Sequence, residues 1–208
     1  MTDSTTSGDS PTALRRKREI AEAARAELCE KGIEGLRMRG VADRCGINVA
    51  TLDYHAGGKD GLIALVAASL ADDFKANRAS IDRDALTGFQ ELMAEVTSFR
   101  TIRRAQPDLH SVMATLSRRA PNDPAIARHI LPMKAFWQGK IAEMIRKGQT
   151  DGSVRPGLDP DATARLFAAA LIYLGSPEQG ALDFPHHAAE LLKLFASEPV
   201  DIDTGPFR

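Results

Sequence analysis

Residues 36–62 read LRMRGVADRCGINVATLDYHAGGKDGL, and this stretch decides the fold. A short helix containing Val41 and Ala42 is predicted to end at Gly46, which has no Cβ and therefore tolerates the left-handed backbone of a sharp turn. Asn48 is a favourable N-cap for a second short helix, because its side-chain oxygen can accept a hydrogen bond from that helix's first turn. Helix, glycine turn and capped helix together predict a helix-turn-helix. That motif presents the start of its second helix to the major groove of DNA.

Apolar residues at helical spacing extend on both sides of this motif. Helices in the first part of the chain are predicted over residues 14–31, 38–45, 49–55 and 59–79. Further along, Pro132 is expected to kink or split a helix. Asp159 is expected to cap another helix that begins with Pro160, and a last helix is predicted over 185–196. Because no segment alternates apolar and polar residues as a strand does, the sequence predicts an all-α fold.

The chain has 208 residues, enough for one small and one medium domain. The predicted parts are a polar tail, a three-helix helix-turn-helix domain, a second helical domain and a short tail, with limits at residues 1–13, 14–60, 61–198 and 199–208. No run of about 18 uncharged apolar residues exists, so no membrane-spanning helix is predicted. The polar N-terminus also lacks the apolar segment of a secretory signal. With Cys29 and Cys45 expected to be buried, reduced thiols, we expect a cytoplasmic protein.

The charge is distributed unevenly along the chain. A net charge of −1 gives the whole protein no attraction for nucleic acid. Residues 13–60, however, hold ten lysines and arginines against eight acidic residues, and four of the ten form the run from Arg15 to Arg18. Such a run can simply be a solvated helix face. Its place directly before a helix-turn-helix favours contacts with DNA phosphates.

The stretch from Ile20 to Leu62 resembles the N-terminal domain of the TetR/AcrR family, the tetracycline-repressor-like transcriptional regulators. The residues that carry the resemblance are Ile20, Ala24, Leu28, Gly32, Val41, Ala42, Gly46, Ile47, Thr51, Leu52, Tyr54, His55, Lys59 and Leu62. The resemblance implies DNA contacts, largely to the backbone, by Thr51, Tyr54, His55 and Lys59. It also implies a homodimer formed by the last two helices of each chain, and a second domain that binds an effector.

Candidate DNA-binding residues surround the second helix of the motif. Val49 and Ala50 offer apolar contact to a thymine methyl group, and Thr51 can donate to a phosphate or a base edge. Lys59 would meet a phosphate at the start of the following helix. Tyr54 and His55 either contact DNA or only pack the end of the helix. The full set is Arg15, Arg18, Arg39, Asn48, Val49, Ala50, Thr51, Asp53, Tyr54, His55 and Lys59.

Three residues depart from the family pattern. Asp53 stands where an aromatic residue is usual, and its carboxylate would repel phosphates unless it accepts from a cytosine amino group or pairs with an arginine. Ala56 replaces a customary Phe and so removes an apolar anchor of the second helix. Arg37 occupies the usual Ser/Thr N-cap position of the first helix of the motif. We therefore expect that first helix to start less firmly.

The second domain offers two further sets of candidates. Large apolar residues at helical spacing either form its core or line a cavity for a small apolar effector. The pocket candidates are Phe99, His110, Met113, Met133, Trp137 and Phe167. Small residues after Asp159 let helices approach closely, which favours self-association. The candidates for a dimer interface are Leu166, Ala169, Ala170, Tyr173, Leu191 and Phe195.

Signatures of catalysis are missing from the sequence. There is no nucleophile elbow, phosphate-binding loop, dinucleotide fingerprint or metal-ligand spacing, so we expect neither an enzyme nor a bound cofactor or metal. The favoured function is a ligand-responsive homodimeric repressor that binds a palindromic double-stranded DNA operator. An activator would share these features. The alternative, kept open by Asp53, Ala56 and the net charge, is an all-α small-molecule sensor or carrier whose specific DNA binding is weak or lost.

Overall fold

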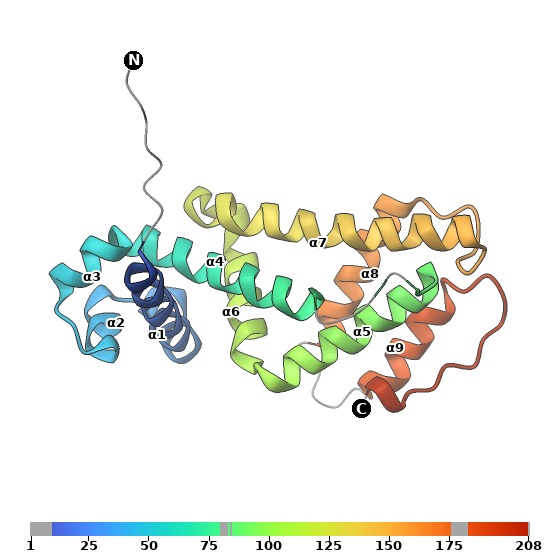
Figure 1. Ribbon diagram of the computed structural model, residues 1–208, viewed down its shortest axis with the longest axis horizontal. Helices are drawn as coiled ribbons and strands as arrows, with labels where there is room; N and C mark the ends of the chain where they lie inside the picture. Colours follow the sequence, from blue (N-terminus) through green and yellow to red (C-terminus); the bar gives the residue numbers. More distant parts are fainter. Residues whose placement is uncertain (1–9, 80–82, 84, 176–182, 208) are drawn as a thin grey trace, which may run out of the picture. The chain divides into compact units, whose positions relative to one another are not determined.

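The computed structural model describes residues 10–79, 83, 85–175 and 183–207. Its α-helices are α1 (Pro11–Gly35), α2 (Met38–Cys45), α3 (Val49–Ala56), α4 (Gly58–Ala79), α5 (Gly88–Ala105), α6 (Pro107–Arg119), α7 (Pro124–Asp151), α8 (Pro160–Leu174) and α9 (Phe184–Lys193) (Figure 1). Short 3₁₀ turns lie at Ala120–Asn122 and Gly205–Phe207. Within the described ranges the β-structure is an isolated antiparallel bridge between Val154 and Ala196, so the predicted all-α fold is confirmed.

The chain forms two compact units that are interleaved along the sequence. The first comprises residues 1–73 and 108–131, and the second comprises residues 74–107 and 132–208. In the first unit α1, α2 and α3 pack on one another, with Ile20, Leu28, Val41 and Leu52 among their buried residues. In the second unit α5, α8, α9 and the Gly205–Phe207 turn surround a core that includes Leu92, Phe167, Leu171 and Leu192. The domain limits expected from the sequence stay a prediction.

Helix α1 begins three residues earlier than predicted. Ser10 lies in extended backbone, and its hydroxyl accepts a hydrogen bond from the Ala13 N–H at 3.2 Å. Pro11 follows at the first helical position, where its missing N–H costs nothing. Residues 11–13 of the predicted tail are therefore helical, while residues 1–9 lie outside the described residues. Gly32, with φ of 66°, interrupts the helix where the sequence analysis placed its end.

Helix α7 continues through Pro132, so of the two expected effects, a kink or a split, the split is wrong and the kink stays a prediction. A proline inside a helix leaves the carbonyl four residues earlier without its N–H partner. Pro132 and its neighbour Leu131 are exposed. Water can therefore hydrate the freed carbonyl, and the helix persists.

Two residues of the segment predicted as a tail, 199–208, belong to the core of the second unit. Helix α9 ends at Lys193 rather than at residue 196, because the following chain pairs with residues near Val154. Ile202 and Phe207 then fold back onto the second unit, where Phe207 is fully buried. Two apolar residues of this short segment therefore complete the hydrophobic core of the second unit.

We expect Phe207→Ala to destabilise the protein by about 3–5 kcal/mol, because it removes a fully buried aromatic ring and leaves a cavity. Urea unfolding followed by circular dichroism would measure the change. The matched control is Val200→Ala in the same segment, since Val200 is 37% exposed. It should change stability by no more than roughly 1 kcal/mol. Equal effects of the two substitutions would contradict burial of the C-terminal segment.

Candidate nucleic-acid interface

The turn between α2 and α3 has the geometry that the sequence predicted. Gly46 adopts the left-handed conformation with φ of 63°, and the N–H of Ile47 donates to the carbonyl of Ala42 at 3.1 Å. The Oδ1 atom of Asn48 then accepts from the N–H of Thr51 at 2.7 Å, which caps α3. These contacts close a tight helix-turn-helix.

Helix α3 buries one face and exposes the other. Leu52 is fully buried and Ala56 is nearly so, and the two lie one turn apart toward α1 and α2. Val49 and Ala50 are exposed at the start of the helix, and Tyr54 is 86% exposed. The leading end of α3 is thus open to solvent, as groove binding requires. This arrangement is that of the helix-turn-helix class of DNA-binding domains.

The remaining candidates lie at different depths in the first unit. Arg15, Arg18 and Arg39 are exposed, and Arg15 lies 3.7 Å from Glu19 in a solvent-exposed ion pair. Two residues of the candidate set, Thr51 and His55, are partly buried. The His55 ring packs edge-to-face on the Tyr54 ring, with 5.2 Å between the ring centroids. Most of the set is therefore accessible, although its individual DNA contacts stay predictions.

The structure shows the contacts of two residues that depart from the family pattern, Arg37 and Asp53. Arg37 makes no side-chain cap for α2; its guanidinium instead donates to the carbonyls of Glu34 and Leu36 at the end of α1. The expected lack of a side-chain cap on α2 is therefore observed, and the less firm start of this helix stays a prediction. Asp53 is exposed, and no lysine or arginine of the described ranges forms an ion pair with it. Its carboxylate is free to face a partner.

The effect of Ala56 is offset by close contact between α3 and α4. A Cβ built on Gly61 would lie 1.4 Å from the carbonyl oxygen of Ala56, so only glycine fits at this position. The first turn of α4 therefore lies directly on the C-terminal end of α3. Backbone contact replaces the large side chain that the sequence analysis found missing.

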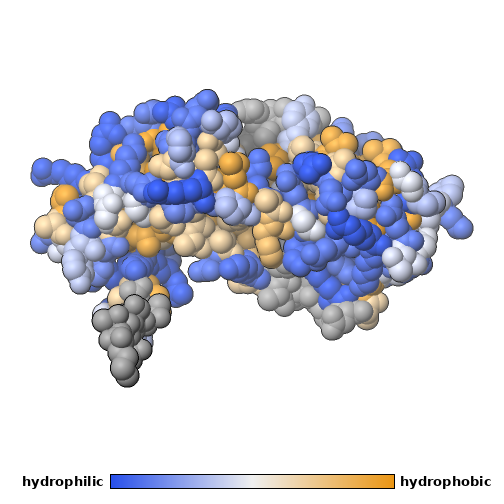
Figure 2. Space-filling view, turned by 90° about the horizontal axis from the view of Figure 1, so that it is seen from above, coloured by the Kyte–Doolittle hydropathy of each residue, from blue (hydrophilic) through white to orange (hydrophobic). Residues whose placement is uncertain are grey.

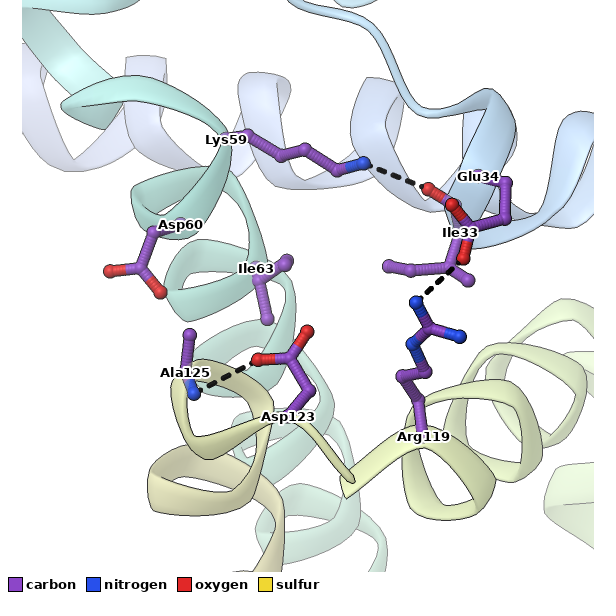
Figure 3. A pocket seen from close by; sticks show the side chains of 8 residues that line it. All are labelled: Ile33, Glu34, Lys59, Asp60, Ile63, Arg119, Asp123 and Ala125. Atoms are coloured by element: carbon purple, nitrogen blue, oxygen red, sulfur yellow. Dashed lines mark hydrogen bonds and ion pairs between the residues drawn. The ribbon is translucent and has the colours of Figure 1, made fainter. Parts of the chain in front are cut away.

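Lys59 is exposed, and the end of its side chain contacts the end of α1. Its Nζ atom donates to the carbonyl of Ile33 at 3.0 Å, beside a pocket of about 290 Å³ in the first unit. Figure 3 shows Lys59 on one side of the pocket and Arg119 on another, where Arg119 pairs with Glu34 at 2.8 Å. The lining residues are Ile33, Glu34, Lys59, Asp60, Ile63, Arg119, Asp123 and Ala125. A phosphate contact by Lys59 requires this side chain to leave Ile33.

A buried carboxylate that the sequence analysis missed joins α1 to α2. Glu27 is 1% exposed, and its two oxygens accept from Lys31 Nζ at 2.6 Å and from Arg44 Nε at 2.8 Å. Hydrogen bonds from Lys31 and Arg44 hold the pKa of the Glu27 carboxyl below its usual value, in spite of its burial. Arg44 also pairs with Glu30. The signal was available, since Glu27 interrupts the apolar face formed by Ile20, Ala24 and Leu28.

A second buried ion, Arg25, joins α1 to α4 and α6. Its guanidinium donates to Asp73 at 2.7 Å and to Asp108 at 3.0 Å, while Arg25 itself is 7% exposed. Cys29, one turn further along α1, is exposed rather than buried as expected, and its thiol lies 3.7 Å from the Asp108 carbonyl. Both cysteines are free.

The predicted effector-pocket residues do not line the pocket in Figure 3. Phe99 and Phe167 are buried in the core of the second unit, and Trp137 packs against that core with its ring 6.2 Å from Phe99. Met133 is partly buried in the same unit. The two candidates that belong to the first unit, both partly buried, are His110 and Met113. An effector site formed by these residues stays a prediction.

The proposed dimer residues divide into exposed and buried groups. Leu166 is 70% exposed and Tyr173 is 57% exposed, and Ala169 on the same helix is also exposed. Ala170 and Leu191 are partly exposed, whereas Phe195 is 4% exposed and packs edge-to-face on Phe167. The side chain of Phe195 is thus committed to the core. On the face shown in Figure 2, hydrophobic residues form small groups among hydrophilic ones.

Comparison with known proteins identifies the family. Residues 20–66 match the model of the bacterial regulatory proteins of the tetR family. The HTH-type transcriptional regulatory protein RaaS of Mycobacterium tuberculosis is 28% identical over 153 residues, which are 72% of this chain and 64% of that relative. The chain thus matches less than two thirds of that relative's length. The resemblance found in the sequence is confirmed: residues 20–66 are those of the tetR family of bacterial regulatory proteins, and the relative is an HTH-type transcriptional regulator.

Solved structures share the fold over most of the chain. A transcriptional regulator of the TetR family from Agrobacterium tumefaciens has a TM-score of 0.76 at 14% identity, covering 88% of this chain and 99% of that one. AibR, solved in complex with isovaleryl coenzyme A and operator DNA, has a TM-score of 0.71 at 21% identity, covering 88% and 98%. At these identities the likeness establishes the fold. It agrees with the predicted succession of a helix-turn-helix domain and a helical domain.

Within the described ranges no helix is both long and apolar enough to cross a bilayer.

We expect Glu27→Gln to lower the free energy of unfolding by about 1–3 kcal/mol at neutral pH, because Lys31 and Arg44 lose their charged partner. Since folding lowers the pKa of Glu27 from 4.5, its contribution is complete above that pH and disappears as the pH falls through the folded value. The difference between the two proteins should therefore close in acid. Urea unfolding at several pH values measures it, with exposed Glu22→Gln on the same helix as control. A difference that stays constant down to about pH 3 would contradict the assignment.

We expect Gly61→Ala to destabilise the first unit by about 1–3 kcal/mol, because the new methyl group must push α4 away from the Ala56 carbonyl. Thermal unfolding would report the loss. Gly139→Ala is the matched control in the middle of α7, where a Cβ meets nothing within 4 Å. That substitution should be neutral or stabilise by up to about 1 kcal/mol. Similar stability of both variants would show that α4 does not rest on α3 in solution.

Proposed function

We propose that this protein is a homodimeric transcriptional repressor that binds a palindromic DNA operator and releases it when a small molecule binds. A cytoplasmic location follows from such a role. The observation that carries the proposal is the capped and solvent-open start of α3, where Asn48, Val49 and Ala50 are exposed. Such a helix end can enter the major groove, and Val49 and Ala50 can contact thymine methyl groups there.

Cationic side chains around α3 supply the contacts to the DNA backbone. Arg18 and Arg39 are exposed, and no ion pair within the described ranges engages them. Lys59 follows the start of α4, where free backbone N–H groups also favour a phosphate. Tyr54 adds an exposed hydroxyl. These contacts fix the position of the domain on the duplex, whereas the start of α3 reads the bases.

A second copy of the chain accounts for the apolar surface of α8. Leu166 and Tyr173 are seven residues apart, so they project from one face of the helix, with Ala169 and Ala170 between them. Small residues beside large exposed ones allow close packing of another helix. A twofold dimer would present two α3 helices to successive major grooves, about 34 Å apart.

Regulation by a small molecule is proposed as a shift between conformers. The AibR structure holds both isovaleryl coenzyme A and operator DNA, which supports a ligand-responsive role for this fold. A ligand that prefers a conformer with wrongly spaced α3 helices lowers operator affinity by its differential binding energy. The partner set is therefore double-stranded DNA, a second copy and a small effector with an apolar part.

The proposal is tested by measuring binding to duplexes taken from the DNA flanking the protein's own gene. A palindromic duplex should be retained in a gel-shift assay, and its affinity should fall steeply with salt. Tyr54→Ala should weaken binding about tenfold, as expected for the loss of a hydrogen bond to a charged group. Lys59→Ala should weaken binding on all duplexes alike and reduce the slope of log affinity against log salt by about one.

Controls separate specific from indifferent binding. Lys134→Ala changes a lysine of the second unit and should leave affinity and salt slope unchanged. A single half-site should bind more weakly than the palindrome, and Leu166→Glu should abolish that difference by preventing dimer formation. Equal affinity for every duplex, unaffected by Tyr54→Ala and Lys59→Ala, would refute the proposal and favour a sensor without an operator.

A further inference from the structure

Three arginines lie together in the last turns of α5. Arg100, Arg103 and Arg104 are spaced so that they occupy one side of the helix. Arg100 and Arg103 are partly buried, and Arg104 is exposed. We call these residues the α5 arginine cluster. It belongs to the second unit and is separate in sequence from the helix-turn-helix.

Acidic side chains of the described residues do not neutralise the α5 arginine cluster. Within the described ranges none of its three guanidinium groups forms an ion pair or a hydrogen bond. The other well-buried arginines differ: Arg25 binds two aspartates, and Arg83 binds Glu95 at 3.1 Å. Among the described residues, the cluster thus differs from Arg25 and Arg83 in lacking a carboxylate partner, although each of those two arginines also has an Nε atom without a partner.

The lack of acceptors for the guanidinium groups is clearest at Arg100. Its guanidinium carbon lies 4.9 Å from the centre of the Phe184 ring, and its Nε atom is inaccessible to water without any partner. Burial, followed by repulsion from Arg104 and Arg103, lowers the pKa of the Arg100 guanidinium. A buried N–H donor without an acceptor destabilises the folded state. An anion placed in the cluster would satisfy the donor and relieve the repulsion.

The position of the cluster at the C-terminal end of α5 explains Arg103 and Arg104 but not Arg100. Cations near a helix C-terminus are stabilised by the helix dipole, which suits Arg103 and Arg104 in the last turn. Arg100 lies a turn earlier, and its buried Nε faces no acceptor. A capping role would not call for a guanidinium stacked on an aromatic ring at that position.

We propose that the α5 arginine cluster binds the anionic group, a carboxylate or a phosphate, of a small-molecule effector. Planar guanidinium groups match both anions with paired hydrogen bonds. Stacking on Phe184 holds Arg100 in place, and Phe184 in turn stacks on Phe99 at 6.4 Å and Phe99 on Trp137. The inference rests on the proposed ligand response and names the chemical class of the ligand: an amphiphile with an acidic head and an apolar part.

The test is calorimetric titration of the full-length protein with two acidic probes. Decanoate supplies a carboxylate and coenzyme A supplies phosphates, while decanol and pantetheine are their uncharged counterparts. We expect one acidic probe to bind and its counterpart not to bind. Arg100→Met and Arg103→Met should each weaken that binding at least tenfold, with Arg100→Lys weakening it less than Arg100→Met. Arg155→Met, which changes an exposed arginine of the same unit, should bind as the parent does.

The outcomes distinguish this inference from the proposed function. Failure of both acidic probes to bind, or equal binding by the parent and both methionine variants, overturns the inference even if operator DNA is retained. Probe binding that depends on Arg100 upholds it even if no duplex is retained, and the proposed function then fails alone. Circular dichroism melting of each variant checks folding, and Arg100→Lys keeps the comparison valid if Arg100→Met unfolds.

Discussion

The geometry of the helix-turn-helix depends on one buried carboxylate. Glu27 lies between α1 and α2 and binds a lysine of its own helix and Arg44 of the next. A buried charge is tolerated only where partners satisfy it, so α2 cannot rotate or slide along α1 without leaving the charge unpaired. Because Gly46 then fixes the angle of the following turn, the direction of α3 is determined by this ion and one left-handed residue.

Sequence patterns predicted the local features of this fold and missed those that depend on distant residues. The turn at Gly46 and the caps by Asn48 and Asp159 involve atoms within a few positions, so residue type alone indicates them. Burial of Phe207 depends on contact of its turn with α5 and α9, and no periodicity precedes it in so short a segment. The tight fit of Gly61 against Ala56 likewise depends on how two helices meet.

In the candidate DNA-binding site, too, local features were predicted from the sequence and features that depend on distant residues were not. The exposure of Val49, Ala50 and Tyr54 follows from helical spacing once Leu52 is buried, and the sequence analysis anticipated it. The contact of Lys59 with Ile33 was not foreseen, because it needs the fold of a chain segment 26 residues apart. That no described residue forms an ion pair with Arg100 could not be foreseen either, since composition counts charges without showing which of them meet.

Arg25 binds residues at the two points where the chain leaves and re-enters the first unit. Its ligands Asp73 and Asp108 are the residues at which the first unit's chain stops and resumes, before and after residues 74–107. Within the first unit, one guanidinium on α1 therefore binds both the last residue before position 74 and the first residue after position 107. Replacing Arg25 by a neutral residue would remove a shared partner from both segment ends at once, so the two segments of the first unit would lose the same link.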